Sequence, residues 1–571
     1  MNLPNEADVI VVGSGAAGMC AAITLKKGGL EPVILEKTQF FGGSTAVSGG
    51  AVWVPGSHLG QATGNKDSRE AAMAYLEAEV GDLLRRDMAE AFLEQGPRAI
   101  RFLESETEVK FAARAVGPDY HPEQPGASLG GRVMDPLDFD ARRLGPALKR
   151  LRYPIPEFTV LNGMMVGRTD LGKLPRALKD PRAFLYASKV VTRHLLDLVR
   201  YRRGTRSVLG NALAARLGKT IQDLQVPILY GTALEALVHD EQGRVTGVEV
   251  LQGKKTHTIR ARHGVLLSSG GFPHDAERRK RIMPHARDRH WSMSPTENTG
   301  DSLRAAEKVG AQIGQSNRHP AFWSPVSRLT RTDGNTVAFP HLFLDRAKPG
   351  LIAIDDSGHR FVNESASYHD FVAAMLERME AGRKRFWLIA DHTFLRRYGV
   401  GVVRPFPGRI APFVRNGYLK RAADTMNLAR LLNVPEQALA QTLAQYNQDA
   451  EKGEDNAFGK GGNAYNRYLG DPANRPNPCL RPITVAPFYA VEVHPGDIGT
   501  SSGLVTDPKA RVLNEQQQHI PGLWAAGNDM NSIMGGSYPG PGITLGPALT
   551  FGWIAANAIL EEAGMPALND Q

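Results

Sequence analysis

The sequence predicts an α/β protein in which one domain is assembled from both ends of the chain and a smaller α+β domain is inserted into it. Three buried strands lead to this prediction, because each runs directly into a glycine turn. They lie at residues 8–13, 264–272 and 522–528 of the 571-residue chain. Since the first and the last lie near opposite termini, one sheet that holds them all must be built from both chain ends.

The first strand, Asp8 to Val12, leads into the most informative turn of the chain. Gly13 permits a tight turn, Gly15 lets the backbone approach a pyrophosphate, and Gly18 lets the next helix pack on the strand. That helix runs through Leu25, and its N-terminus offers N–H groups and a positive dipole end to phosphates. The pattern predicts a Rossmann-like domain that binds a dinucleotide.

The second strand, Val33 to Leu35, ends at Glu36, whose carboxylate can accept the ribose hydroxyls. The small residues at 41–50 favour FAD over NAD, because they let the backbone reach the flavin side of the cofactor. Their Gly-Gly-Ser-Thr part contains no histidine, so we expect FAD to bind non-covalently. The FAD-binding residues predicted here are Gly13, Ser14, Gly15, Ala16, Gly18, Glu36, Lys37, Gly42, Gly43, Ser44, Thr45, Ser48 and Gly49.

Later segments complete the two domains. Strands at 226–240 and 247–251, a helix from 299 to 309 and a last helix ending at Leu560 fit the FAD-binding domain. A strand at 351–354, helices at 370–381 and 435–448 and many loops fit the inserted one. We assign residues 1–320 and 490–571 to the FAD-binding domain, with a basic insertion at about 140–210, and 321–489 to the catalytic, capping domain.

The net charge of +9 is concentrated in one segment. Residues 141–220 hold 18 lysines and arginines (Arg142 to Lys219) against four acidic residues, a net +14, so the rest carries −5. Within it, Leu185, Val191, Leu195 and Leu198 recur at helical spacing. One interpretation is a helix that packs its apolar face on the core and solvates its basic face. The other is attachment to anionic lipid. Nucleic-acid binding is not expected, because no recognition module accompanies the charge.

Cys20 and Cys479 are the only cysteines, which predicts neither a disulfide framework nor a metal cluster. No apolar run approaches the length of a membrane-spanning helix, and a core strand at Asp8 leaves little room for a signal peptide. We therefore expect a cytoplasmic protein, with peripheral binding to the inner face of the membrane as the further expectation if the basic segment attaches to lipid. His319 and His494 are expected to be structural or pocket-lining, and no metal site is predicted.

Six motifs, in order along the chain, resemble the FAD flavoproteins of the fumarate reductase and 3-ketosteroid dehydrogenase superfamily. They are the turn at 13–18, Ser-Ser-Gly-Gly-Phe at 268–272, Thr-Gly-Asp-Ser at 299–302, the segment 358–364, Ala-Pro-Phe-Tyr-Ala at 486–490 and Ala-Ala-Gly-Asn at 525–528. The basic segment departs from the shorter members. The resemblance implies further FAD contacts at Ala233, Gly270, Gly527, Asn528, Thr544 and Leu545.

Within this superfamily, three tyrosines resemble those of the 3-ketosteroid Δ1-dehydrogenases. Tyr120 ends a Pro-Asp-Tyr motif, although Gly117 stands where an aromatic residue often precedes it. Tyr368 matches the catalytic base. Tyr538, with the backbone N–H of Gly542, matches the group that holds the substrate ketone. The resemblance thus implies desaturation of the carbon 1–carbon 2 bond of a 3-ketosteroid.

This reaction explains the residue types. Removing a proton beside a ketone makes an enolate, so hydrogen-bond donors must meet the carbonyl oxygen; one preorganised donor contributes about 3–4 kcal/mol. The base must be uncharged when an apolar steroid binds, which a tyrosine allows if its pKa falls from about 10. We expect Tyr120 to hydrogen-bond Tyr368 and stabilise its anion. The hydride passes to the flavin, and a quinone-type or artificial electron acceptor then reoxidises the flavin.

Three alternatives stay open. A 3-ketosteroid Δ4-(5α)-dehydrogenase would use similar tyrosines on the neighbouring bond. A fumarate reductase-like enzyme would need an arginine acid and a cationic clamp, for which Arg404, Arg409 and Arg415 are candidates. A non-enzyme alternative is a flavin-binding electron-transfer protein that docks on membranes.

Overall fold

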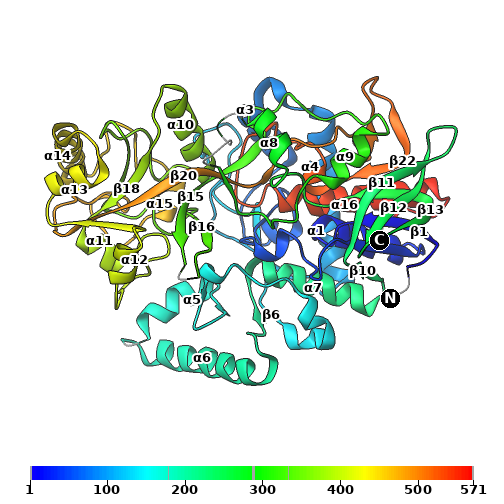
Figure 1. Ribbon diagram of the computed structural model, residues 1–571, viewed down its shortest axis with the longest axis horizontal. Coiled ribbons are helices and arrows are strands. Elements are labelled where there is room, and N and C mark those ends of the chain that lie inside the picture. The colour runs from blue at the N-terminus through cyan, green and yellow to red at the C-terminus, as the bar shows by residue number, and fades with distance from the viewer. Residues whose placement is uncertain (1–2, 178, 284, 286–289, 332, 569–571) are drawn as a thin grey trace.

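The computed structural model describes residues 3–177, 179–283, 285, 290–331 and 333–568, and it is a mixed α/β structure with a largely parallel sheet of eight strands. The parallel strands are β10 (Ile228–Tyr230), β2 (Pro32–Glu36), β1 (Glu6–Val12), β13 (Lys255–Leu267) and β22 (His519–Ala525). The sheet is completed by antiparallel β12 (Val245–Gln252), β11 (Thr232–His239) and β21 (Arg511–Leu513). Strands from both chain ends therefore share this sheet, at the right of Figure 1.

Two buried helices pack against this sheet, α1 (Ala16–Lys27) on β1 and β2 and α16 (Leu545–Glu562) on β13 and β22. In α1 every residue from 16 to 25 is buried, and α16 is buried almost throughout. A helix that is apolar on all sides belongs in a core, and these two pack along each other, with α4 (Arg86–Glu106) against α16. Gly552 allows α1 and α16 to approach, because a Cβ there would lie 2.5 Å from the carbonyl oxygen of Ala17. Gly18 lets α1 pack on the turn after β1, because a Cβ there would lie 2.1 Å from the carbonyl oxygen of Gly13.

The predicted strand at 226–240 is two strands in the structure. Gly231 adopts φ +64°, a left-handed conformation that breaks the extended backbone. Residues before it form β10 beside β2, whereas residues after it form the β11–β12 hairpin that the sequence predicts around 240–243. The predicted helix at 299–309 is the shorter α9 (Asp301–Glu307).

A second sheet of seven strands lies at the left of Figure 1. It contains β14 (Trp291–Ser292), β15 (Ala321–Thr330), β16 (Thr336–Pro340), β17 (Leu351–Asp355), β18 (Phe386–Ala390), β19 (Leu419–Ala422) and β20 (Phe488–Thr500). The helices α10 (Tyr368–Glu380), α13 (Thr425–Leu432) and α14 (Glu436–Lys452) contribute to the two apolar clusters around it. This sheet extends beyond the predicted limits of 321 and 489, because β14 and the end of β20 pair within it.

Shorter elements connect and flank the two sheets. They are β3 (Val52–Trp53), α2 (His58–Gln61), α3 (Arg69–Val80), β4 (Phe111–Ala113), β5 (Val133–Pro136), β6 (Phe139–Asp140), β9 (Arg206–Ser207), α7 (Leu209–Asp223), α8 (Ala276–Ile282), α11 (His392–Arg397), α12 (Ala411–Arg415) and α15 (Ala464–Leu469).

The basic segment forms a separate layer at the lower edge of Figure 1. It comprises β7 (Thr159–Val160), β8 (Met164–Met165), α5 (Arg168–Lys173) and α6 (Pro181–Tyr201). The only buried residues of α6 are Ala183, His194 and Asp197. His194 Nε2 lies 2.8 Å from the carbonyl oxygen of Leu161, and Asp197 accepts a 2.6 Å bond from the Thr205 hydroxyl. The inward face of this helix is therefore partly polar.

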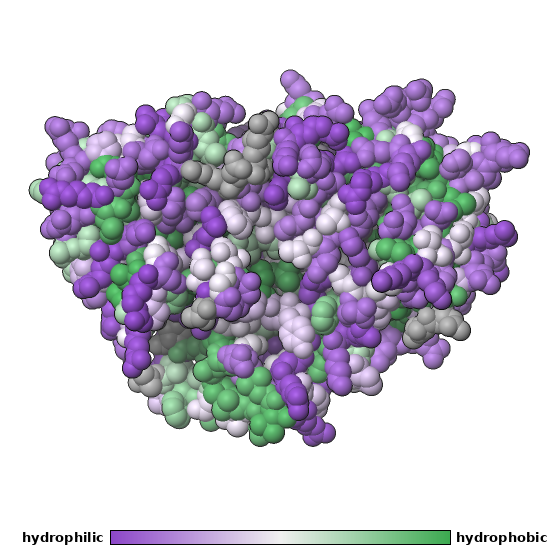
Figure 2. Space-filling view, viewed as in Figure 1, coloured by the Kyte–Doolittle hydropathy of each residue, from purple (hydrophilic) through white to green (hydrophobic). Residues whose placement is uncertain are grey.

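The outward face of α6 is apolar. Leu185, Leu195, Leu196 and Val199 are 72%, 52%, 65% and 86% exposed. Of the two interpretations of this segment, the one in which the apolar face packs on the core does not hold for Leu185 and Leu195, since the polar residues His194 and Asp197 take the inward positions. Figure 2 shows the resulting hydrophobic patch over this helix at the lower edge of the molecule. Within the described residues, no helix is long and apolar enough to span a bilayer.

Candidate active site

The glycine turn after β1 leaves room for a bound group. A Cβ on Gly15 would meet only the Thr45 hydroxyl, at 3.9 Å, and one on Gly49 would meet nothing within 4 Å. Gly43 faces Gly15, since a Cβ on it would lie 3.6 Å from the Gly15 Cα. Gly15 and Gly43 thus line an open cradle at the N-terminus of α1, as a pyrophosphate requires.

Glu36 and Lys37 behave differently at the end of β2. Glu36 is buried and accepts hydrogen bonds from the Ser14 hydroxyl and, at 2.8 Å, from the backbone N–H of Thr38. Its carboxylate is held at the edge of the cradle. The Lys37 ammonium is 2.7 Å from both the Asp301 carboxylate and the Thr299 hydroxyl. Lys37 therefore ties β2 to α9, and its predicted contact with FAD stays a prediction.

Asn298 joins two predicted FAD segments that are far apart in sequence, and the sequence analysis did not find it. Its amide donates at 3.0 Å to the Ser44 hydroxyl and at 3.2 Å to the carbonyl oxygen of Gly270. It precedes the Thr-Gly-Asp-Ser motif at 299–302, which carries part of the family resemblance but to which no FAD contact was assigned. Asn298 thus links the N-terminal turn to the middle of the chain. The FAD contacts of Ser48, Ala233, Gly527, Asn528, Thr544 and Leu545 stay predictions.

The three predicted tyrosines lie against one another in the fold. The ring centroids of Tyr120 and Tyr368 are 5.6 Å apart, those of Tyr120 and Tyr538 5.6 Å, and those of Tyr368 and Tyr538 5.1 Å. All three are buried, with at most 6% of each residue exposed. They come from the loop after β4, the first turn of α10 and the loop before α16, so the fold joins three distant segments in one cluster.

Tyr465 is a fourth member of this tyrosine cluster and was not found from the sequence. It lies in α15, is buried, and its ring centroid is 4.7 Å from that of Tyr120. Phe322 stands edge-on to Tyr538 at 5.4 Å. No motif signals Tyr465, because its segment is a loop-rich part of the chain without periodic structure.

Comparisons with known proteins identify the family of this chain. The chain matches the FAD binding domain family over residues 8–545. It is 37% identical to the 3-oxosteroid 1-dehydrogenase of Mycolicibacterium smegmatis, over 96% of each chain. The chain belongs to the FAD-binding 3-oxosteroid dehydrogenase family. FAD is its cofactor.

Two further relatives of this chain are described with the compound that they bind or act on. The structure of the 3-ketosteroid Δ1-dehydrogenase of Sterolibacterium denitrificans, in complex with 1,4-androstadiene-3,17-dione, matches with a TM-score of 0.90 at 37% identity, covering 98% of this chain and 100% of that one. The 4-oxocyclohex-2-ene-1-carboxylate 5-dehydrogenase of Sinomonas cyclohexanicum is 38% identical, over 97% of this chain and 93% of that enzyme. The 3-ketosteroid Δ4-(5α)-dehydrogenase of Rhodococcus jostii, at 21% identity and a TM-score of 0.65, shows the fold alone.

Burial raises the pKa of every tyrosine in the cluster of this dehydrogenase. The pKa of Tyr538 rises to about 12, and those of Tyr120 and Tyr368 lie well above their usual value. For Tyr368, the neighbouring Tyr120 and Tyr538 raise the pKa further. The expectation that Tyr120 lowers the pKa of Tyr368 is therefore wrong in this structure, because loss of solvation dominates. The cluster is uncharged at neutral pH.

The arginines considered for a dicarboxylate clamp lie outside the tyrosine cluster. Arg404, Arg409 and Arg415 are exposed, and the Arg404 guanidinium donates to the carbonyl oxygen of Thr159 in the basic segment. His319 stacks edge-on against His369 at 5.0 Å, so it lines the approach to Tyr538. His494 lies in β20, opposite Val326.

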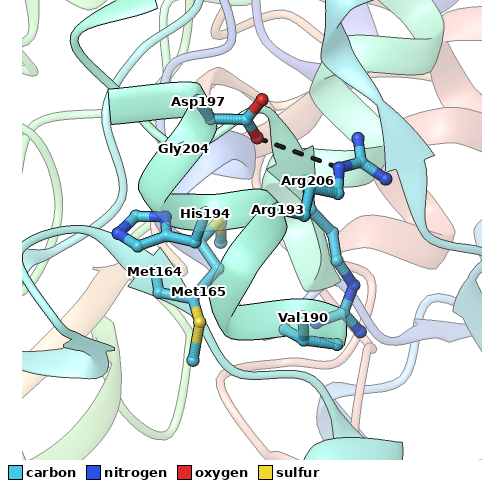
Figure 3. Close-up of a pocket in the computed structure, with 8 residues that line it drawn as sticks. All are labelled: Met164, Met165, Val190, Arg193, His194, Asp197, Gly204 and Arg206. Carbon is cyan, nitrogen blue, oxygen red and sulfur yellow. Dashed lines mark ion pairs between the residues drawn. The ribbon is translucent and has the colours of Figure 1, made fainter. Parts of the chain in front are cut away.

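A small pocket in the basic segment is not a substrate site. It lies between β8 and α6, where Arg193 Nε is 3.8 Å from a carboxylate oxygen of Asp197; this ion pair is the dashed line in Figure 3. Met164, His194 and Gly204 also line it. Its volume of about 10 Å³ is at the limit for one water molecule, so it reflects imperfect packing under α6.

Proposed function

We propose that this protein oxidises 3-ketosteroids at the carbon 1–carbon 2 bond, with FAD as the hydride acceptor. The observation that carries the proposal is the buried tyrosine cluster, in which Tyr120, Tyr368 and Tyr538 converge from three segments. Uncharged hydroxyls in an apolar surrounding suit an apolar substrate whose one reacting polar group is a ketone. The identity to 3-oxosteroid 1-dehydrogenases over nearly the whole chain supports the same reaction.

In this proposal each tyrosine has one role. The Tyr538 hydroxyl and the Gly542 N–H hold the ketone oxygen and stabilise the enolate. Tyr368 takes the proton from the carbon beside the ketone, and Tyr120 contacts Tyr368 from the side. FAD, when bound, supplies a two-electron acceptor for the hydride. Because the pKa of Tyr368 is raised, its anion is a minor species at neutral pH, so turnover should rise as the pH rises.

The relative from Sinomonas makes a small oxo-carboxylate a second candidate substrate. A carboxylate in this pocket would need a cation with unoccupied donors. Arg114, which is already paired with Asp135, and the buried Arg346 both act on Tyr120. The Arg346 guanidinium already donates to the main-chain carbonyl oxygens of residues 341, 342, 364 and 366. This arrangement favours the steroid over the carboxylate.

A product analysis tests the proposed reaction and its position. The protein should convert androst-4-ene-3,17-dione into the 1,4-diene, and should act on a 5α-saturated 3-ketosteroid at carbon 1 as well. It should turn over 4-oxocyclohex-2-ene-1-carboxylate far more slowly. A 4-ene as the product of the 5α-saturated substrate would assign it to the Δ4-(5α) class instead, and preference for the carboxylate would overturn the steroid assignment.

We also propose that residues 1–320 and 490–571 form most of the FAD-binding domain and that 321–489 form the body of the catalytic domain, to whose sheet β14 and β20 also belong. FAD is held without a covalent bond. In support, the Gly-Gly-Ser-Thr run at 42–45 offers no histidine, and the cradle at Gly15 is lined by glycines. Acid precipitation should therefore release all of the flavin colour into the supernatant. Colour that stays with the pellet would contradict non-covalent binding.

Attachment to the cytoplasmic face of a membrane is the proposal that the α6 surface supports. The exposed apolar side chains of α6 stand beside the exposed cations Arg182, Lys189, Arg200 and Arg202. Cations near anionic lipid contribute about 1 kcal/mol each, and an apolar face adds insertion. Arg203 and Arg206 do not belong to this surface: Arg203 donates to the carbonyls of 148 and 151, and Arg206 pairs with Asp138 and Asp170.

The protein should therefore sediment with anionic liposomes at low salt. Replacing Leu196 and Val199 with serine should weaken this binding, because both side chains face outward. Serine at Met426 and Leu431, exposed apolar residues of α13, is the matched control and should leave binding unchanged. If neither the wild type nor either variant binds the liposomes, the proposed membrane attachment through α6 is wrong. A quinone in that membrane is the electron acceptor we propose.

A further inference from the structure

His121 bridges two carboxylates beside the tyrosine cluster. Its Nδ1 lies 2.8 and 2.9 Å from the two carboxylate oxygens of Glu79, and its Nε2 lies 2.9 Å from Asp370 Oδ2. Glu79 ends α3, whereas Asp370 lies in the first turn of α10. One imidazole therefore connects a helix of the first core with a helix of the second sheet.

The bridge requires a charged imidazole. Burial alone would lower the pKa of His121, but the hydrogen bonds to Asp370 and Glu79 raise it to about 10. Both ring nitrogens then donate, each to an acidic partner. Because this ionic group joins the segments that carry Tyr120 and Tyr368, it can fix their positions.

The same three residues border all three predicted catalytic tyrosines. His121 follows Tyr120 directly. Asp370 stands two residues after Tyr368, and it also pairs with Ser367, whose hydroxyl caps α10.

The segment that carries the third tyrosine, Tyr538, is bonded to the main chain of Glu79. The carbonyl oxygen of Glu79 accepts a 3.1 Å bond from the Ser537 hydroxyl, next to Tyr538. Tyr75, one turn earlier on α3, donates at 2.6 Å to the carbonyl oxygen of Pro539. That same carbonyl oxygen accepts the N–H of Tyr120 at 2.9 Å. The backbone beside the three tyrosines is thus bonded either to this ionic group or to Tyr75 on α3.

We propose that His121, held between Glu79 and Asp370, is a positioning residue that sets the distance and orientation of Tyr120 relative to Tyr368. It touches neither substrate nor flavin, and it acts only through the tyrosine that precedes it. This role rests on the proposed dehydrogenase function. A displacement of about 1 Å in a catalytic group can cost about 100-fold in rate, so the His121 bridge controls turnover without taking part in the chemical step.

The test is a double-mutant cycle. His121→Gln cannot bond both carboxylates as a cation, and it should lower kcat about tenfold or more while flavin content and KM for androst-4-ene-3,17-dione stay near wild type. In a Tyr120→Phe background the same change should cost less than about threefold, because the hydroxyl that it positions is already gone. Glu77→Gln, on the exposed face of α3 and paired with Arg86, is the control and should leave kcat unchanged.

Several results would overturn this inference. A wild-type kcat in His121→Gln would show that the His121 bridge is dispensable. An equal loss of kcat with and without the Tyr120 hydroxyl would show that the bridge does not act through Tyr120. If His121→Gln binds no flavin, Glu79→Gln decides, since it keeps the main-chain contact with Ser537. That variant must then lose kcat, and normal turnover in it ends the proposal. Absence of steroid turnover in the wild type would instead reject the proposed function.

Discussion

Tyr368→Phe should lower turnover of androst-4-ene-3,17-dione by about 10²-fold or more. The change removes only the hydroxyl that takes the proton, and the loss of a general base has effects of this size. The ring remains, so the contacts with Tyr120 and Tyr538 at 5.6 and 5.1 Å should persist. Flavin content and melting temperature should therefore match the wild type.

Steady-state rates as a function of pH check this expectation. The wild-type rate should rise with pH, because burial keeps Tyr368 protonated at neutral pH and only the anion can accept a proton. The variant should lose this rise. Tyr446→Phe, a buried tyrosine in the core of the inserted sheet, is the matched control and should retain activity. Near-normal turnover in Tyr368→Phe would remove this residue from the mechanism.

Tyr538→Phe should lower both the rate and the affinity for the ketone. One preorganised donor to a developing oxyanion accounts for about 10²–10³-fold in kcat, and the same donor already holds the ketone in the ground state. Because burial raises the pKa of Tyr538 to about 12, its hydroxyl stays protonated and able to donate through pH 10. Steroid affinity of the wild type should then be flat from neutral pH to about pH 10.

Flavin-detected steroid titrations and single-turnover rates measure the two effects separately. Retained affinity with a lower rate would mean that Tyr538 donates only in the transition state. Unchanged affinity and rate would assign the ketone to other donors, and the Gly542 N–H would be the next to examine.

Features with a local physical cause could be predicted from the sequence. The turn at Gly13 to Gly18 is one, since its backbone conformation and close contacts demand glycine. The strand, turn and helix around it need no distant partner to be recognised. The three tyrosines were placed by resemblance, and their convergence depends on contacts between segments hundreds of residues apart.

Features set by tertiary packing could not be predicted. Tyr465 and the His121 bridge lie in segments without a repeating pattern, and only the fold brings them to the tyrosines. The apolar positions of α6 were found, but periodicity does not reveal which face of a helix meets the core. The direction of the tyrosine pKa shift was also missed, because it depends on burial, which the sequence motif does not report.

Anaerobic mixing of the FAD-loaded protein with androst-4-ene-3,17-dione tests the central claim most directly. If the tyrosine cluster binds a 3-ketosteroid and passes its hydride to FAD, the flavin absorbance should bleach in a single turnover, with one equivalent of the 1,4-diene formed. The product and the reduced flavin should appear together, and Tyr368→Phe should slow both. A flavin that stays oxidised in the presence of saturating steroid would contradict the account.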